Sequence, residues 1–122
     1  MRAFVFAALL AAAAAQAHAD TAGMTVFETH GDILYAMVPA DRASDVRHIE
    51  RAAEKLCESR GYCRVQVWSE SLDKPTGREY HPRYKENLVA EFQKDRYRGV
   101  PSRVLMNCKM FPQSSPSQCG AF

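Results

Sequence analysis

The four cysteines carry the most distinctive chemistry in this sequence, because a cysteine can act as a nucleophile or form a disulfide. They are Cys57, Cys63, Cys108 and Cys119. A catalytic cysteine needs a free thiolate beside an imidazole, and zinc needs cysteines and histidines at ligand spacing. The zinc spacing is absent, and the gap from Cys57 to Cys63 does not fit a two-residue redox motif. The even number predicts two disulfides and no metal or other cofactor.

The pairing of these cysteines depends on the direction of the strands. Cys57 and Cys63 flank a short turn, so we expect a bridge between them and a second bridge from Cys108 to Cys119 that tethers the tail. Each such short loop contributes roughly 2 to 3 kcal/mol in the chain-entropy model. The rival pairing, Cys63 with Cys108 and Cys57 with Cys119, requires the two strands involved to run antiparallel.

Acidic side chains after a predicted strand could supply general acid and base groups. Glu70, Asp73 and Glu79 lie in or beside a polar segment, 70–82, that contains turn-forming prolines and a glycine. Open α/β sheets bind ligands at the carboxyl ends of parallel strands. A small secreted hydrolase is therefore the alternative hypothesis for function, although acidic residues after a strand are also ordinary turn formers.

Aromatic and basic residues support the preferred hypothesis, a non-catalytic binding module, because tryptophan, tyrosine and arginine are enriched at binding hot spots. Some of these residues belong to strands and the others to an aromatic and basic cluster at 80–84. The candidates are Arg64, Gln66, Trp68, Arg103, Tyr80, His81 and Tyr84. The expected partner is a protein, a glycan or an envelope component, and a homodimer is a further option.

Residues 1–19 have the pattern of a secretory signal peptide. One arginine precedes an alanine- and leucine-rich run, and an A-x-A cleavage site ends at Ala19. Removal of this segment leaves 20–122 as a single small domain, with no membrane span expected and a proline- and serine-rich tail from about residue 110. The expected location is the periplasm or the exterior of the cell.

Charge gives no reason to expect a nucleic-acid partner. Residues 20–122 hold 15 basic and 14 acidic side chains, a net charge of +1. Residues 20–59 hold 4 basic and 8 acidic, whereas residues 60–122 hold 11 basic and 6 acidic. The C-terminal half is weakly basic, but a pronounced basic stripe is absent.

The segment 44–69 positions the first two cysteines. Apolar residues recur at steps of three and four from Val46 to Leu56, which predicts a helix capped by Asp41 or Ser44. Gly61 is expected to end that helix in a left-handed conformation. The apolar residues then alternate from 63 to 68, which predicts a strand.

Four more elements follow from similar patterns. Strands are expected near 26–27 and at 33–38, joined by a turn at 30–32. Tyr84, Leu88 and Phe92 step by four, which predicts a second helix over 83–98, with Pro82 before it and Gly99 as its stop. Alternation over 102–108 predicts a third principal strand.

The order strand, helix, strand, helix, strand predicts a small α/β domain, with an α+β, ferredoxin-like antiparallel sheet as the alternative. We expect a disulfide-stapled, two-layer sandwich with three to four strands and both helices on one face. The other face is then uncovered, which favours a role in binding. It would carry Tyr35, Arg64, Gln66, Trp68, Arg103 and Leu105.

Overall fold

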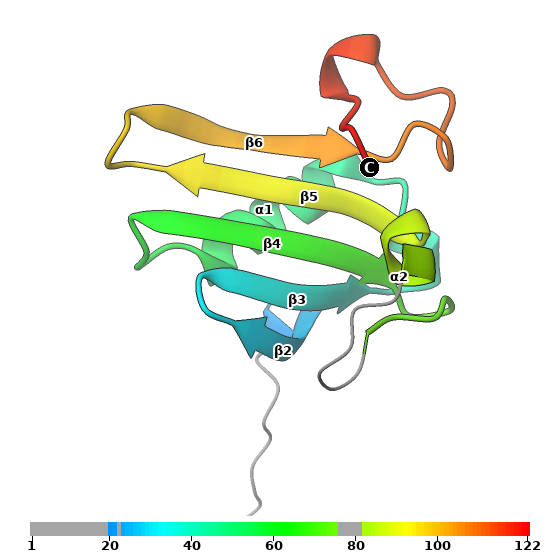
Figure 1. Ribbon diagram of the computed structural model, residues 1–122, viewed down its shortest axis with the longest axis horizontal. Helices are drawn as coiled ribbons and strands as arrows, with labels where there is room; N and C mark the ends of the chain where they lie inside the picture. The colour runs from blue at the N-terminus through cyan, green and yellow to red at the C-terminus, as the bar shows by residue number, and fades with distance from the viewer. Residues whose placement is uncertain (1–19, 22, 76–81) are drawn as a thin grey trace, which may run out of the picture.

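The computed structural model describes residues 20–21, 23–75 and 82–122, so the predicted signal peptide lies outside the described residues. In the described part, six strands form one mixed sheet in chain order, with two α-helices and two 3-10 helices (Figure 1). The class is α+β, with more strands than the three to four expected. The elements are β1 (Asp20–Thr21), β2 (Met24–His30), β3 (Ile33–Val38), α1 (Val46–Leu56), β4 (Tyr62–Ser69), α2 (Pro82–Glu86), β5 (Leu88–Asp95) and β6 (Val100–Met106); the 3-10 helices are Ala40–Arg42 and Pro116–Gln118.

Helix α1 covers one face of the sheet (Figure 1). Its N-cap is Asp45, beside the expected Ser44, and the Asp45 carboxylate accepts a hydrogen bond from the backbone N–H of His48 at 3.1 Å. The helix ends at Leu56, and Gly61 does not adopt the left-handed conformation expected there. Gly61 instead makes room for the ring of Tyr97, which a Cβ atom would meet.

The core fills the space between α1 and the sheet. Strands β3 and β4 are parallel neighbours joined through α1, and their alternate residues face the helix. The buried cluster includes Leu34, Ala36, Val38, Ile49, Ala52, Ala53, Cys57, Cys63, Val65, Val67, Ala90, Phe92, Val104 and Met106.

The second helix predicted over 83–98 is wrong for most of its length. Only α2 is helical, and β5 occupies the rest of that segment as an antiparallel strand between β4 and β6. A spacing of four residues, as from Leu88 to Phe92, is close to one helical turn and is also two strand repeats, so it does not distinguish the two structures. The prediction of two helices on one face is wrong as well, because α2 contributes Lys85 to a hollow on the face opposite α1.

Both preferred disulfides are present, Cys57–Cys63 and Cys108–Cys119. Strands β4 and β6 are each antiparallel to β5 and therefore run parallel to one another, unlike the arrangement that the rival pairing requires. The second disulfide holds the tail against the end of β6. There the backbone N–H of Gly120 donates to the carbonyl of Met106 at 2.9 Å.

Candidate functional site

The strand residues proposed for binding lie together on the face of the sheet opposite α1. Side chains alternate along each strand, so the residues between the core positions point to this side. Cross-strand pairs place Tyr35 beside Gln66 and Gln66 beside Glu91, with a second row formed by Arg64, Gln93 and Arg103. We call the side chains of this face the outer face: Tyr35, Arg64, Gln66, Leu88, Glu91, Gln93, Arg103 and Leu105.

Trp68 was expected as an exposed member of this face, and that expectation is wrong. Its side chain is fully buried, with ring centroids 5.8 Å from Phe27 and 5.2 Å from Tyr35. The indole N–H donates to the backbone carbonyl of Tyr84 at 2.8 Å. Trp68 therefore links the sheet to α2. Tyr84 is half-buried, while the candidates Tyr80 and His81 lie outside the described residues.

A polar network crosses the outer face. Arg64 donates from Nε and Nη2 to Oε1 of Glu91 at 2.9 and 2.7 Å, and Nε2 of Gln93 donates to the same oxygen at 2.9 Å. Arg103 donates from Nε and Nη2 to Oε1 of Gln93 at 3.2 and 3.0 Å. Burial acts to lower the pKa of Arg64, but the hydrogen bond and charge of Glu91 outweigh it, so this pKa is raised. The Arg64 guanidinium is thus paired with the Glu91 carboxylate, whereas the Arg103 guanidinium donates hydrogen bonds to the neutral side-chain amide of Gln93.

Beside this network lies a hollow of about 370 Å³, which we call the outer hollow. Its walls combine polar, cationic and apolar groups. They are Tyr35, Arg64, Gln66, Lys85, Leu88, Glu91, Ala121 and Phe122. The Oε1 atom of Gln66 is buried and has no hydrogen-bond partner among the described residues. Burial, and then the charge of Glu28, raises the pKa of Tyr35, so its hydroxyl stays neutral at physiological pH.

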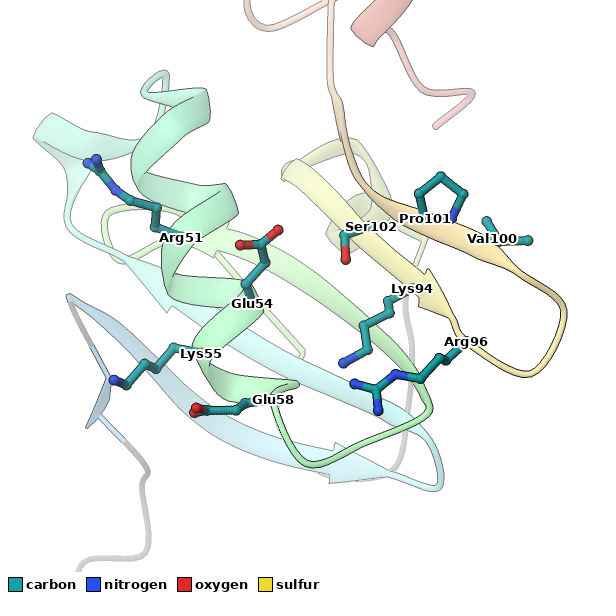
Figure 2. Close-up of a pocket in the computed structure, with 9 residues that line it drawn as sticks. All are labelled: Arg51, Glu54, Lys55, Glu58, Lys94, Arg96, Val100, Pro101 and Ser102. Carbon is teal, nitrogen blue, oxygen red and sulfur yellow. The ribbon is translucent and has the colours of Figure 1, made fainter.

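A second concavity, which we call the helix groove, lies on the α1 side of the molecule (Figure 2). It has a volume of about 560 Å³ between the C-terminal half of α1 and the hairpin of β5 and β6. Figure 2 shows Lys94 and Arg96 projecting from the hairpin toward the helix. The groove is lined by Arg51, Glu54, Lys55, Glu58, Lys94, Arg96, Val100, Pro101 and Ser102, which gives four cations and two carboxylates.

The structure brings no catalytic set together from the described candidates. Glu70 and Asp73 are exposed and line neither the outer hollow nor the helix groove, and Glu79 lies outside the described residues. All four cysteines are in disulfides, so none is free to act as a nucleophile. No group of metal-ligating side chains occurs in 20–21, 23–75 and 82–122, and no helix there is long and apolar enough to cross a membrane.

Three residues of the site were missed from the sequence. The helix predicted over 83–98 contains Lys85, Glu91 and Gln93, so the sequence does not place them at the sheet. The signal for a strand was present, because Ala90 and Phe92 alternate with Glu91 and Gln93.

Comparison with known proteins adds no assignment: no protein-family model, curated protein or solved structure matches this chain.

Proposed function

We propose that this protein is an exported, non-catalytic binding module that holds a partner at the outer hollow. The two disulfides support an oxidising compartment, either the periplasm or the cell exterior. The observation that carries the proposal is the buried Gln66 oxygen, which has no hydrogen-bond partner in the described part of the chain. A buried acceptor left unpaired costs about 1 to 3 kcal/mol, which a ligand that donates a hydrogen bond would recover.

The other residues that line the outer hollow determine which chemical groups a ligand needs in order to bind there. Lys85 has no ion pair in the part of the chain that the structure describes, so it is available for an anionic group. Arg64 is already held by Glu91 and serves to fix the wall of the hollow. Leu88 and Phe122 supply apolar surface. A suitable ligand group therefore carries an N–H or O–H donor beside a carboxylate, as acidic peptides and acidic sugars do.

The test follows the side-chain amide of Gln66 by ¹⁵N NMR while probe compounds are added. N-acetylglutamate offers both a carboxylate and an N–H donor, acetate offers only the carboxylate, and N-acetylglycinamide offers only the donor. We expect N-acetylglutamate to shift the Gln66 amide at the lowest concentration. Equal shifts by all three probes, or shifts confined to the α1 side, would contradict the proposal.

Two variants with matched controls identify the groups responsible. Gln66→Leu removes the acceptor and Lys85→Glu reverses the cation, and each should weaken N-acetylglutamate binding by about tenfold. Gln113→Leu and Arg47→Glu make the same changes at exposed positions outside the hollow, and binding should be unaffected. Unchanged binding in both test variants would show that the outer hollow is not the site.

A further inference from the structure

The two disulfides lie in different surroundings. Cys57 and Cys63 are completely buried in the hydrophobic core. Cys119 is exposed at the surface, and Cys108 is half-buried. A disulfide breaks when a thiolate attacks one of its sulfur atoms, so access decides which bridge reacts, and exposed bridges are the labile ones. A reductant in solution therefore reaches the Cys108–Cys119 bridge before the buried one.

The exposed bridge holds residues 120–122 beside the end of β6. Met106 pairs with Cys119 there as an isolated bridge in the parallel sense, and the N–H of Gly120 donates to the Met106 carbonyl at 2.9 Å. An isolated pairing of this kind is weak by comparison with a covalent bond. The position of residues 120–122 therefore depends on the disulfide.

These residues form part of the outer hollow, whose wall includes Ala121 and Phe122. The Phe122 ring lies close to Gly120, because a Cβ atom on Gly120 would come within 2.8 Å of that ring and 3.0 Å of the Leu105 Cβ atom. Leu105 belongs to the outer face, so the ring is packed where Gly120 meets this face. The disulfide that fixes Gly120 thereby also fixes an apolar wall of the outer hollow.

We propose that the Cys108–Cys119 disulfide is a redox switch, and that its reduction by a dithiol releases residues 119–122 from the outer face. A thiolate of the dithiol attacks the Cys119 sulfur, and the Cys108 sulfur leaves with the bonding electron pair and takes up a proton. The second thiol of the reductant then attacks its own sulfur in the mixed disulfide, and the Cys119 sulfur leaves and is protonated. Two electrons and two protons thus pass to the cysteines, and the dithiol becomes a disulfide.

The consequence for binding rests on the proposed function. Release of residues 119–122 removes the Phe122 wall from the outer hollow, so a ligand bound beside Gln66 loses apolar contact. We expect reduction to weaken N-acetylglutamate binding by about threefold or more. The opening of the switch is measured without any ligand, so the switch and the proposed function can fail separately.

Alkylation of the native protein identifies which bridge reacts. The protein is treated with dithiothreitol in the absence of denaturant, and new thiols are trapped with iodoacetamide and located by mass spectrometry. We expect Cys108 and Cys119 to be labelled at least about tenfold faster than Cys57 and Cys63. Equal rates for the two pairs would overturn the proposal.

NMR of the selectively reduced protein shows whether residues 119–122 are released. Exchange of the Gly120 amide hydrogen should accelerate several-fold, and the Leu105 methyl signals should shift because the Phe122 ring has moved away. The signals of Ile49 in the core should stay unchanged. An unchanged Gly120 exchange rate would overturn the proposal, and so would a general loss of core signals, because the bridge would then be needed for folding.

Two variants connect the switch to binding. Cys108→Ser/Cys119→Ser should bind N-acetylglutamate as weakly as the reduced protein and should not respond to dithiothreitol. Phe122→Ala keeps the bridge and should weaken binding to a similar extent, whereas Tyr97→Ala removes an exposed ring that does not line the outer hollow and should leave binding unchanged. Equal binding by the oxidised and reduced protein would contradict the switch. Absence of binding in both states would overturn the proposed function alone, because labelling and exchange decide the switch.

Discussion

The two faces of the sheet are built on different principles. On the side of α1, apolar side chains from the helix and the strands fill the interior, and Phe92 and Ile49 are fully buried. On the outer face, a chain of hydrogen bonds joins Arg64, Glu91 and Gln93, and beside it the Gln66 oxygen is buried with no partner among the residues that the structure describes. On the α1 side, the protein's own apolar side chains fill the interior. On the outer face, a hydrogen-bond acceptor, the Gln66 oxygen, remains unpaired among the described residues.

This contrast separates stability from binding. Burial of apolar surface is the main contribution to folding, so the α1 side should dominate the free energy of unfolding. An unpaired buried acceptor lowers stability, and we therefore propose that it serves to bind a ligand. The following predictions test this division, from the largest expected effect to the smallest.

Phe92→Ala should disrupt the hydrophobic core on the α1 side of the sheet. The ring is fully buried under α1, and truncation of a buried phenylalanine typically costs 3 to 5 kcal/mol, so we expect a loss of about that size. Urea denaturation followed by circular dichroism measures it. Val100→Ala, at a 40% exposed position, is the control and should change stability by less than about 0.5 kcal/mol. Equal losses in the two variants would show that the core is placed wrongly.

Trp68→Phe tests a large aromatic side chain that is fully buried outside the α1 core. It keeps most of the packing against Phe27 and Tyr35 but removes the N–H that bonds the Tyr84 carbonyl. We expect a loss of about 0.5 to 1.5 kcal/mol, because that carbonyl loses one hydrogen bond and keeps the one from the backbone N–H of Asn87. Thermal unfolding gives the value, and Tyr97→Phe at an exposed ring should leave the melting temperature nearly unchanged.

Gln66→Leu should change the free energy of unfolding in the opposite direction. Removing the unpaired acceptor is expected to stabilise the protein by about 1 kcal/mol, whereas under the proposed function the same variant should weaken ligand binding. Denaturant midpoints for the variant and for Gln113→Leu provide the comparison. If Gln66→Leu destabilised the protein, the amide would have to be bonded in the native state.

Asp45→Asn should give the smallest change, visible mainly in its pH dependence. The backbone N–H of His48, opposed by desolvation and helped by Arg42, lowers the pKa of Asp45. A lowered pKa means that the carboxylate stabilises the fold above its unfolded pKa, near 4, and that this contribution is lost as pH falls through the folded pKa.

The Asp45→Asn variant should therefore lose less stability than the wild type between neutral pH and about pH 3. Denaturation at both pH values gives this difference. Asp41→Asn, which does not cap α1, serves as the control. Identical pH profiles for Asp45→Asn and the wild type would contradict the assignment.

The sequence predicted the first half of the fold better than the second. For α1, apolar residues fall at helical steps that no strand shares, and a capping residue stands one position from the expected serine. The cysteines near the ends of their elements predicted both bridges. Over 83–98 the apolar spacing fits the helical period and the strand period equally. The segment forms a strand because β5 pairs with β4 on one side and β6 on the other.

The same ambiguity between helix and strand limited how many residues of the outer face could be predicted from the sequence. Arg64, Gln66 and Arg103 could be placed on one face from alternation alone, but Glu91 and Gln93 were hidden by the predicted helix. The burial of Trp68 depends on Phe27 and on the backbone of α2, both distant in sequence. Contacts of this kind arise from the tertiary structure and leave no local pattern.

The strands of this sheet follow one another in space in the same order as in the chain. Each new strand pairs with the one made just before it, and the two longest connections are those from β3 to β4, through α1, and from β4 to β5, over 70–87. Such local pairing lowers the entropy of loop closure and favours rapid folding. The sheet can therefore grow strand by strand from the N-terminal side, and the two disulfides close loops that are already short.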